Sequence, residues 1–293
     1  MSARYHSGMK VCRSIAEYRE EIARYRAAGD SVGLVTTMGA LHAGHMALVG
    51  RAKIECDRVV TTIFVNPTQF GQAADLANYP RTEEADLRLF ADAGVDAVLI
   101  PTVEQMYPPG EETIVETTHL ANILHGEVRP GHFRGVATVV TKLFNIAQPD
   151  RAYFGEKDYQ QLAVIRRMAR DLLMPIDVVG VPTVREDDGL AMSSRNVRLT
   201  PEHRKEATVL NRVLTECASV LTAGATAEGL RDMAETMVHT ETSGRLRAFD
   251  IVDIETFAPV DGPISKPVAV MMSVEFGSGD DTVLLIDQRE FTS

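Results

Sequence analysis

A regular alternation of short apolar runs with longer helical segments, between residues 31 and 181, most constrains the fold of this chain. The short runs are compact and rich in β-branched residues, as buried strands are. The longer segments space their apolar residues at helical intervals; Thr82 is placed to cap one of them and Gly94 to end it. Repeated strand–helix–strand units predict a parallel sheet with helices on both faces. The predicted strands are residues 31–37, 58–65, 95–100, 151–154 and 176–181, and the predicted helices are residues 44–56, 82–93, 135–147 and 158–173.

The chain changes character after Pro182. Helices are predicted over residues 201–221 and 227–240, followed by strands over residues 249–256, 268–274 and 282–286. We therefore expect two domains, an α/β domain over residues 1–183 and a smaller α+β domain over residues 184–293.

The charge and composition of the chain limit the kinds of partner, cross-link and location that we expect for it. The 293 residues include 30 Lys+Arg and 41 Asp+Glu, a formal charge of -11, which disfavours nucleic-acid binding. The three cysteines are too few for a disulfide framework or a zinc cluster. The sequence has neither the apolar core of a signal peptide nor a membrane-spanning run, so we expect a cytoplasmic protein.

Two histidines stand where the strand at residues 31–37 meets the next helix. His42 and His45 flank Gly44 at this junction, where a helix N-terminus offers backbone N–H groups to phosphate. Their imidazoles would add donors aimed at developing phosphate charge. The pattern favours a nucleotide site. The alternative is two ordinary histidines, one capping the helix and the other facing solvent.

Four further polar clusters stand out, and three of them follow predicted strands or precede helices. Residues 154–161 offer Lys157 as a phosphate ligand, with a solvated surface lysine as the alternative. Residues 189–196 combine small hydroxyls with Arg195, which suits phosphate contact, although an ordinary loop also uses these residue types. Residues 65–71 carry the amides of Asn66 and Gln69, which suit a hydroxylated substrate or a plain turn. Residues 129–135 bring two arginines and a histidine to a helix start, as a solvated basic loop also would.

Taken together, these strings closely resemble the pantothenate synthetase family, the pantoate–β-alanine ligases. The resemblance covers most of residues 8–200 and is thin beyond them. The chain departs from the family pattern at Thr36, where proline is usual, and at Ala43, where glutamate is usual. The matching strings are residues 37–45, 64–71, 79–82, 129–138, 149–162 and 192–196.

The resemblance implies a Rossmann-like ATP- and pantoate-binding domain, a smaller C-terminal lid domain and a homodimer. It implies that ATP, pantoate and β-alanine give pantothenate, AMP and pyrophosphate through a pantoyl adenylate. The β-alanine amine must be neutral to attack, and the sequence identifies no residue that takes its proton. The loop at residues 189–196 is expected to order when ATP binds.

The resemblance also implies roles for individual residues. Asp86 is a candidate Mg²⁺ anchor, or alternatively an ordinary carboxylate in the first turn of a helix. The catalytic set is His42, His45, Lys157 and Arg195. The ATP-binding set is Met38, His45, Gly155, Lys157, Asp158, Val184, Met192, Ser193, Ser194 and Arg195. The pantoate-binding set is Met38, Asn66, Gln69 and Gln161.

Three rival functions compete with this one. Another nucleotidyl transferase of the same superfamily would share the histidine motif but would not account for residues 66–71 or 155–161. A relative of the aminoacyl-tRNA synthetases would need an RNA-binding face, which the net charge disfavours. An inactive scaffold would have no need of the phosphate-contact groups, and all of them are intact here.

Overall fold

The computed structural model describes residues 8–71, 76–222 and 224–292 of the chain. The chain divides into two compact units. The first unit comprises Met1–Gly155 and Gln160–Pro182, and the second comprises Glu156–Tyr159 and Thr183–Ser293. The segment Glu156–Tyr159, which we expected in the first domain, therefore groups with the second unit. The assignment of substrate binding to residues 1–183 and of a lid to residues 184–293 stays a prediction.

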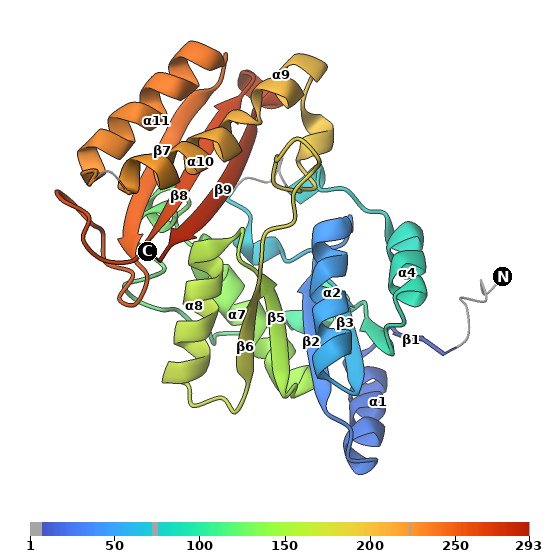
Figure 1. Cartoon of the computed structure of the whole chain (residues 1–293). Helices are drawn as coiled ribbons and strands as arrows, with labels where there is room; N and C mark the ends of the chain where they lie inside the picture. Colours follow the sequence, from blue (N-terminus) through green and yellow to red (C-terminus); the bar gives the residue numbers. More distant parts are fainter. Residues whose placement is uncertain (1–7, 72–75, 223, 293) are drawn as a thin grey trace. The chain divides into compact units, whose positions relative to one another are not determined.

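A six-stranded parallel sheet forms the centre of the first unit. Its strands lie in the order β1-β4-β3-β2-β5-β6, with helices packed against them (Figure 1). The strands are β1 (Lys10–Cys12), β2 (Val32–Thr37), β3 (Arg58–Ile63), β4 (Ala97–Leu99), β5 (Arg151–Gly155) and β6 (Asp177–Val181).

Strand β2 lies where the strand order reverses. From β2 the chain passes outward through β3 to β4, and it later returns to β5 on the other side of β2. Open α/β sheets bind ligands outside the carboxyl ends of the strands at such a reversal. We expected residues 31–37 to be the first strand, and this was wrong because the three-residue β1 precedes them. Since β1 pairs with β4 at the edge of the sheet, β2 keeps the central position.

The helices of this unit follow the prediction except at α1, at α7 and at two short helices over residues 103–106 and 125–128 that were not predicted. Helix α1, which was not predicted, begins with a capping box between Ser14 and Glu17. Helix α7 begins at His132, three residues before the predicted start, directly after Gly131 in the left-handed conformation (φ 81°). The helices preceding β6 are α1 (Ile15–Ala27), α2 (Ala43–Glu55), α4 (Glu83–Asp92), α5 (Val103–Met106), α6 (His125–Val128), α7 (His132–Ala147) and α8 (Tyr159–Asp171), with the 3-10 turn η1 (Pro67–Gln69).

The apolar core explains where α2 and α4 lie. Leu48 and Val49 of α2 and Leu87 and Phe90 of α4 join one buried cluster with alternate side chains of β2, β3 and β4. These two helices therefore cover the same face of the sheet, and they bring the start of α2 to the carboxyl end of β2. The described residues include no helix long and apolar enough to cross a membrane.

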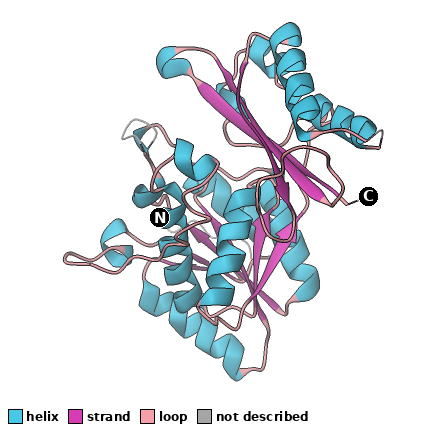
Figure 2. Ribbon diagram, turned by 90° about the vertical axis from the view of Figure 1, so that its left-hand side faces the viewer, coloured by secondary structure: helices cyan, strands magenta, loops and turns pink. Residues whose placement is uncertain are grey.

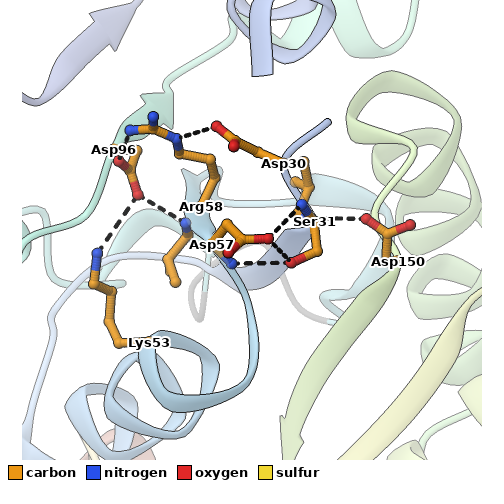
Figure 3. A network of polar contacts seen from close by, with 9 residues as sticks. Asp30, Ser31, Lys53, Asp57, Arg58, Asp96 and Asp150 are labelled. Carbon is orange, nitrogen blue, oxygen red and sulfur yellow. Dashed lines mark hydrogen bonds and ion pairs between the residues drawn. The ribbon is translucent and has the colours of Figure 1, made fainter. Parts of the chain in front are cut away.

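Polar side chains join the amino ends of the central strands (Figure 3). Asp57 accepts hydrogen bonds from the amide and the hydroxyl of Ser31 at 2.9 and 2.6 Å. Asp150 accepts one from the amide of Val32 at 2.7 Å. These carboxylates accept hydrogen bonds from backbone N–H groups that have no partner in the sheet at the ends of its strands.

Arg58 extends this network toward β4. Its guanidinium lies 2.7 Å from the carboxylate of Asp30 and 3.0 Å from that of Asp96 (Figure 3). Asp96 also accepts a hydrogen bond from the Val59 amide at 2.8 Å. The network thus fixes the strand register at the end of the sheet opposite to the predicted site.

The second unit is an antiparallel sheet in the order β7-β8-β9, with α10 and α11 packed on one side of it (Figures 1 and 2). Its buried cluster combines the apolar side chains of both helices with alternate side chains of the strands. The predicted fold class is therefore confirmed for both parts of the chain. The elements are α9 (Pro201–Glu206), α10 (Val209–Leu221), α11 (Ala227–Glu241), β7 (Arg245–Asp253), β8 (Val268–Phe276) and β9 (Val283–Phe291), with the 3-10 turns η2 (Asn196–Arg198) and η3 (Gly279–Asp281).

The predicted strands of this unit were too short at two ends, since β7 begins at Arg245 and β9 ends at Phe291, and two further boundaries were wrong for a local reason. The single helix expected over residues 201–221 is divided into α9 and α10; the hydroxyl of Thr208 donates to the Lys205 carbonyl at 2.9 Å and competes with the helical bonds there. The strand expected over residues 249–256 ends at Asp253, whose carboxylate accepts hydrogen bonds from the amides of Glu255 and Thr256 and so closes a turn.

Replacing Asp57 by Asn tests the network at the amino ends of the strands. The hydrogen bonds from Ser31 hold the pKa of Asp57 below its ordinary value. Its contribution to stability is therefore complete above about pH 4, near the pKa of an unfolded aspartate, and is lost as the pH falls through the lower folded value. We expect Asp57→Asn to lower the Tm by a few degrees at pH 7, and the two melting curves to converge at acid pH, once the Asp57 carboxylate is protonated in the folded protein.

Thermal melts at a series of pH values between those limits check this expectation. The matched control is Asp92→Asn at the exposed end of α4, where no such hydrogen bonds are made with described residues. A difference in Tm that stays constant as the pH falls would show that the Asp57 charge is not what stabilises the strands.

Candidate active site

The loop that follows β2 is held by a buried carboxylate. Gly39 and Ala40 both adopt the left-handed conformation, with φ of 83° and 51°. Asp86, only 2% exposed, accepts hydrogen bonds from the amides of Ala40 and Leu41 at 3.0 and 2.9 Å. A Cβ on Gly39 would lie 3.0 Å from the Asp86 carboxylate, so this position needs glycine for both space and conformation.

These contacts bear on the expected metal role of Asp86. Both of its oxygens already accept hydrogen bonds from the loop, and the Thr82 hydroxyl lies within 3.2 Å of each. Among the described residues, no group of three or more histidine, cysteine or acidic side chains could hold a metal ion. The described side chains therefore do not form a Mg²⁺ site of their own, and Asp86 fits the alternative role of a structural carboxylate.

His42 and His45 form the start of α2 together. His42 is the N-cap, and its Nδ1 accepts a hydrogen bond from the Gly44 amide at 3.1 Å. The Nδ1 of His45 accepts one from the His42 amide at 3.3 Å, and the ring centroids lie 4.1 Å apart. This is a capping box in which imidazoles replace the usual hydroxyl and carboxylate.

The capping box fixes the tautomer of both histidines. A ring nitrogen that accepts a hydrogen bond carries no proton, so in each histidine Nδ1 is unprotonated and Nε2 carries the hydrogen. The capping alternative is thus correct for His42, but it does not replace the phosphate-binding interpretation, because the cap leaves Nε2–H as the donor nitrogen of each ring. Two imidazole donors and the positive end of the α2 dipole favour an anion at this point.

Met38, Asn66 and Gln69 meet at the ends of β2 and β3. Asn66 Nδ2 donates to Gln69 Oε1 at 3.0 Å, and Gln69 Nε2 points to Met38 Sδ at 3.3 Å. Asn66 is only 1% exposed, and its amide is bonded to protein groups at both ends. Asn66 therefore fits a structural role beside Gln69 better than direct contact with a substrate.

The basic cluster at residues 129–135 lies against the same glutamine. His132 Nδ1 lies 2.8 Å from the backbone carbonyl of Gln69, and Arg129 contacts His132 Nε2 at 3.3 Å. Gly135 lets α7 pack directly on η1, since a Cβ there would lie 2.5 Å from the Thr68 carbonyl oxygen. Three clusters that are separate in the sequence are thus joined at one end of the sheet.

Gln161, the fourth expected pantoate ligand, lies in the first turn of α8. Its half-buried side chain makes no hydrogen bond with another described residue. The preceding Gln160 is buried and bonds to the backbone of Leu120, Ile123 and His125. Gln160 is therefore structural, and the Gln161 amide remains available to a ligand.

Residues at the start of α8 carry the expected phosphate lysine. Gly155 ends β5 with open space around its Cα, half-buried Lys157 follows it, and Asp158 is exposed. Lys157 forms no ion pair with any described residue, which is consistent with an anionic ligand and equally with a solvated lysine.

Residues 184–192 form a hairpin within the second unit. The Met192 amide donates to the Val184 carbonyl at 2.9 Å, and Gly189 occupies the tip with a φ of 89°. Arg185 holds the hairpin through a bidentate pair with buried Asp287, at 2.6 and 2.9 Å. The expected ATP-contacting residues Val184 and Met192 thus belong to one braced element.

The hydroxyl cluster follows this hairpin. Ser193 Oγ accepts a hydrogen bond from the Arg195 amide at 3.2 Å, and Asn196 Nδ2 donates to the Ala191 carbonyl at 3.1 Å. Ser194 and Arg195 are half-buried, and the Arg195 guanidinium has no ion-pair partner among the residues that the structure describes. This differs from Arg185 and Arg204 of the same unit, which are both paired with aspartates.

Sequence reasoning missed two residues at the site. Tyr107 follows α5 and donates to Asn66 at 2.7 Å, and Lys142 of α7 lies over the Tyr107 ring. Neither stands beside a motif, and Tyr107 lies 41 positions after Asn66, so only the fold brings the two together.

Comparison with known proteins adds independent information. A family model described as pantoate-beta-alanine ligase matches residues 10–290. The pantothenate synthetase of Sinorhizobium medicae is 52% identical over 283 residues, which cover 96% of each chain.

Solved structures agree with these matches. The crystal structure of pantothenate synthetase from Thermus thermophilus superposes with a TM-score of 0.89 at 46% identity, covering 96% of this chain and 99% of the other. The pantoate-beta-alanine ligase of Francisella tularensis, complexed with beta-gamma ATP and beta-alanine, has a TM-score of 0.79 at 31% identity and covers 96% and 97%. The resemblance and the enzyme class predicted from the sequence are confirmed, and the chain belongs to the pantoate–β-alanine ligase family.

Proposed function

We propose that this chain joins pantoate to β-alanine at the expense of ATP, through a pantoyl adenylate, and releases AMP and pyrophosphate. The observation that carries the proposal is the imidazole capping box at the carboxyl end of β2, where the strand order reverses. It is supported by membership of the family and by the ATP and β-alanine named in the Francisella tularensis complex.

The first step is attack of the pantoate carboxylate on the α-phosphorus of ATP. A carboxylate is ionised at pH 7, so this step needs alignment and relief of phosphate charge rather than a general base. His42 and His45 donate Nε2–H to the phosphates, and Lys157 and Arg195 add positive charge. The remaining ATP contacts in the proposal are Met38, Gly155, Asp158, Val184, Met192, Ser193 and Ser194.

Pantoate binding is assigned to Met38, Gln69 and Gln161. The nitrogen of the Gln69 amide points toward Met38. It therefore donates to an oxygen of pantoate, while Met38 packs against the methyl groups of pantoate. Asn66 contributes by holding Gln69. In the second step the β-alanine amine attacks the acyl carbon and AMP leaves, with desolvation lowering the pKa of the ammonium.

Mg²⁺ and a homodimer, which are supported by the resemblance alone, belong to the same proposal, as does the cytoplasmic location expected from the sequence. The steps given above use only groups of this chain, because the described side chains do not form a metal site. Light scattering on the purified protein measures the mass of the assembly against the 32.1 kDa of one chain.

The experiment that tests the proposed function is mass spectrometry of the enzyme with ATP, Mg²⁺ and pantoate in the absence of β-alanine. Pantoyl adenylate and pyrophosphate should accumulate, and adding β-alanine should convert the adenylate to pantothenate. The absence of both adenylate and pyrophosphate would remove the proposal.

The two roles of the histidines can be separated by a double substitution. His42→Ser with His45→Gln restores an ordinary capping box and removes both imidazoles. We expect the Tm to stay within a few degrees of the parent while pyrophosphate release slows at least about a hundredfold, the usual effect of removing a transition-state donor. The comparison variant, His42→Ala with His45→Ala, should also lose about 1 kcal/mol of helix capping.

Stopped-flow measurement of pyrophosphate release distinguishes these outcomes. A normal rate in the Ser/Gln variant would show that the histidines are helix caps only. Slow amide formation after normal adenylation would move them to the second step.

Gln69→Ala and Gln161→Ala should weaken the binding of pantoate more than that of ATP. Each loses neutral hydrogen bonds, so we expect the pantoate Kd to rise roughly tenfold with the ATP Kd nearly unchanged. Separate titrations of each ligand measure this, with Asn145→Ala in α7 as the control, an exposed side-chain amide that makes no hydrogen bond with a described residue. Equal weakening of both ligands would indicate general damage to the protein.

Arg195→Lys retains a positive charge but loses the planar fork that binds two phosphate oxygens. We expect adenylation to slow about tenfold with the Tm unchanged, since the Arg195 guanidinium pairs with no described acidic residue. Arg198→Lys, three residues along, is the control. Equal rates in the parent and Arg195→Lys would exclude bidentate phosphate contact by Arg195.

A further inference from the structure

A neighbouring group that can only accept hydrogen bonds distinguishes the nitrogen of the Asn66 side-chain amide from its oxygen. The backbone carbonyl of Gly135 lies 3.3 Å from Asn66 Nδ2, so the nitrogen of this amide must face it. The oxygen, Oδ1, then faces the opposite way, toward Tyr107 and Thr68. The assignment of nitrogen and oxygen therefore follows from the backbone of α7.

Tyr107 supplies the shortest hydrogen bond to that oxygen. Its hydroxyl donates to Asn66 Oδ1 at 2.7 Å, while the Thr68 hydroxyl lies 3.0 Å from the same atom. Burial raises the pKa of Tyr107 above its ordinary value, so the hydroxyl keeps its proton at neutral pH.

Tyr107 is itself held through both its ring and its backbone. Lys142 Nζ lies 4.2 Å from the ring centroid and pairs with Glu111 at 2.6 Å. The Tyr107 amide donates to the Val103 carbonyl at 2.7 Å, at the end of α5. Tyr107 is thus a fixed donor rather than a rotating surface phenol.

Asn66 passes this orientation on to Gln69. Because Asn66 Nδ2 donates to Gln69 Oε1, the Gln69 nitrogen must point away from Asn66, toward Met38. A reversed Gln69 amide would set two NH₂ groups against each other. Asn66 thus determines that Gln69 presents a donor, and an acid substrate needs a donor at this point.

We propose that Tyr107 is a positioning residue for pantoate, acting through Asn66 to hold the Gln69 amide with its nitrogen toward the substrate. This inference rests on the proposed function, in which Gln69 binds pantoate. Tyr107 itself contacts neither substrate nor nucleotide in the proposal. Its effect should appear in pantoate affinity and not in ATP affinity.

Tyr107→Phe tests the proposal, because it removes the hydroxyl and keeps the ring beneath Lys142. We expect the pantoate Kd to rise about five- to tenfold, the usual consequence of one lost hydrogen bond, with the ATP Kd unchanged. Thr68→Val removes the second donor to Asn66 Oδ1 and should shift pantoate affinity in the same direction. Tyr18→Phe is the control, because its buried hydroxyl bonds instead to the Thr61 carbonyl; it should leave the pantoate Kd unchanged.

A double-substitution cycle identifies the route of the effect. If Tyr107 acts through Gln69, Tyr107→Phe should change the pantoate Kd by less than about twofold in a Gln69→Ala background. Full additivity of the two substitutions would overturn the positioning role. The same conclusion would follow if Gln69→Ala raised the pantoate Kd while Tyr107→Phe left it unchanged. An unchanged pantoate Kd in Gln69→Ala would overturn both the pantoate site and the inference built on it.

Discussion

The buried carboxylate of Asp86 is the interaction on which the predicted site depends. Left-handed backbone at a residue such as Ala40 costs roughly 1–2 kcal/mol, and two consecutive left-handed residues form only when something holds them. Two hydrogen bonds from backbone amides to the Asp86 carboxylate hold this conformation, since hydrogen bonds to charged groups each contribute about 1.5–3 kcal/mol of stability. The resulting turn ends β2 and places His42 as the N-cap of α2, so a residue of α4 determines where the two imidazoles lie.

The polar groups at the two ends of the parallel sheet differ in how fully they are hydrogen-bonded within the protein. At the amino ends, aspartates and Arg58 pair leftover backbone groups and one another, and most of their hydrogen-bonding capacity is used within the protein (Figure 3). At the carboxyl ends, helix caps and amides leave donors such as Gln69 Nε2 facing a thioether, which is a weak acceptor. The carboxyl ends therefore keep groups that a ligand satisfies better than the protein does.

The sequence predicted the sheet because buried parallel strands and their helices leave strong periodic signals, and it predicted His42, His45 and Gln69 because they stand in motifs. It missed β1, which has three residues and no pattern of its own. It offered Asp86 two roles and could not decide between them, because the Ala40 and Leu41 amides lie 46 and 45 residues away. Tyr107 had no sequence signal, since its importance depends on which way Asn66 turns.

The imidazole capping box couples the start of α2 to the chemistry proposed for it. Each Nδ1 can cap the helix only without a proton, so the same hydrogen bonds that begin α2 require neutral rings with Nε2–H donors. Neutral donors strengthen as charge develops on a phosphate oxygen, and they hold a departing pyrophosphate less firmly than fixed cations would. A serine and glutamate cap would begin the helix equally well but would set a carboxylate against the phosphates. Histidine meets both requirements at these two positions because one of its nitrogens accepts while the other donates.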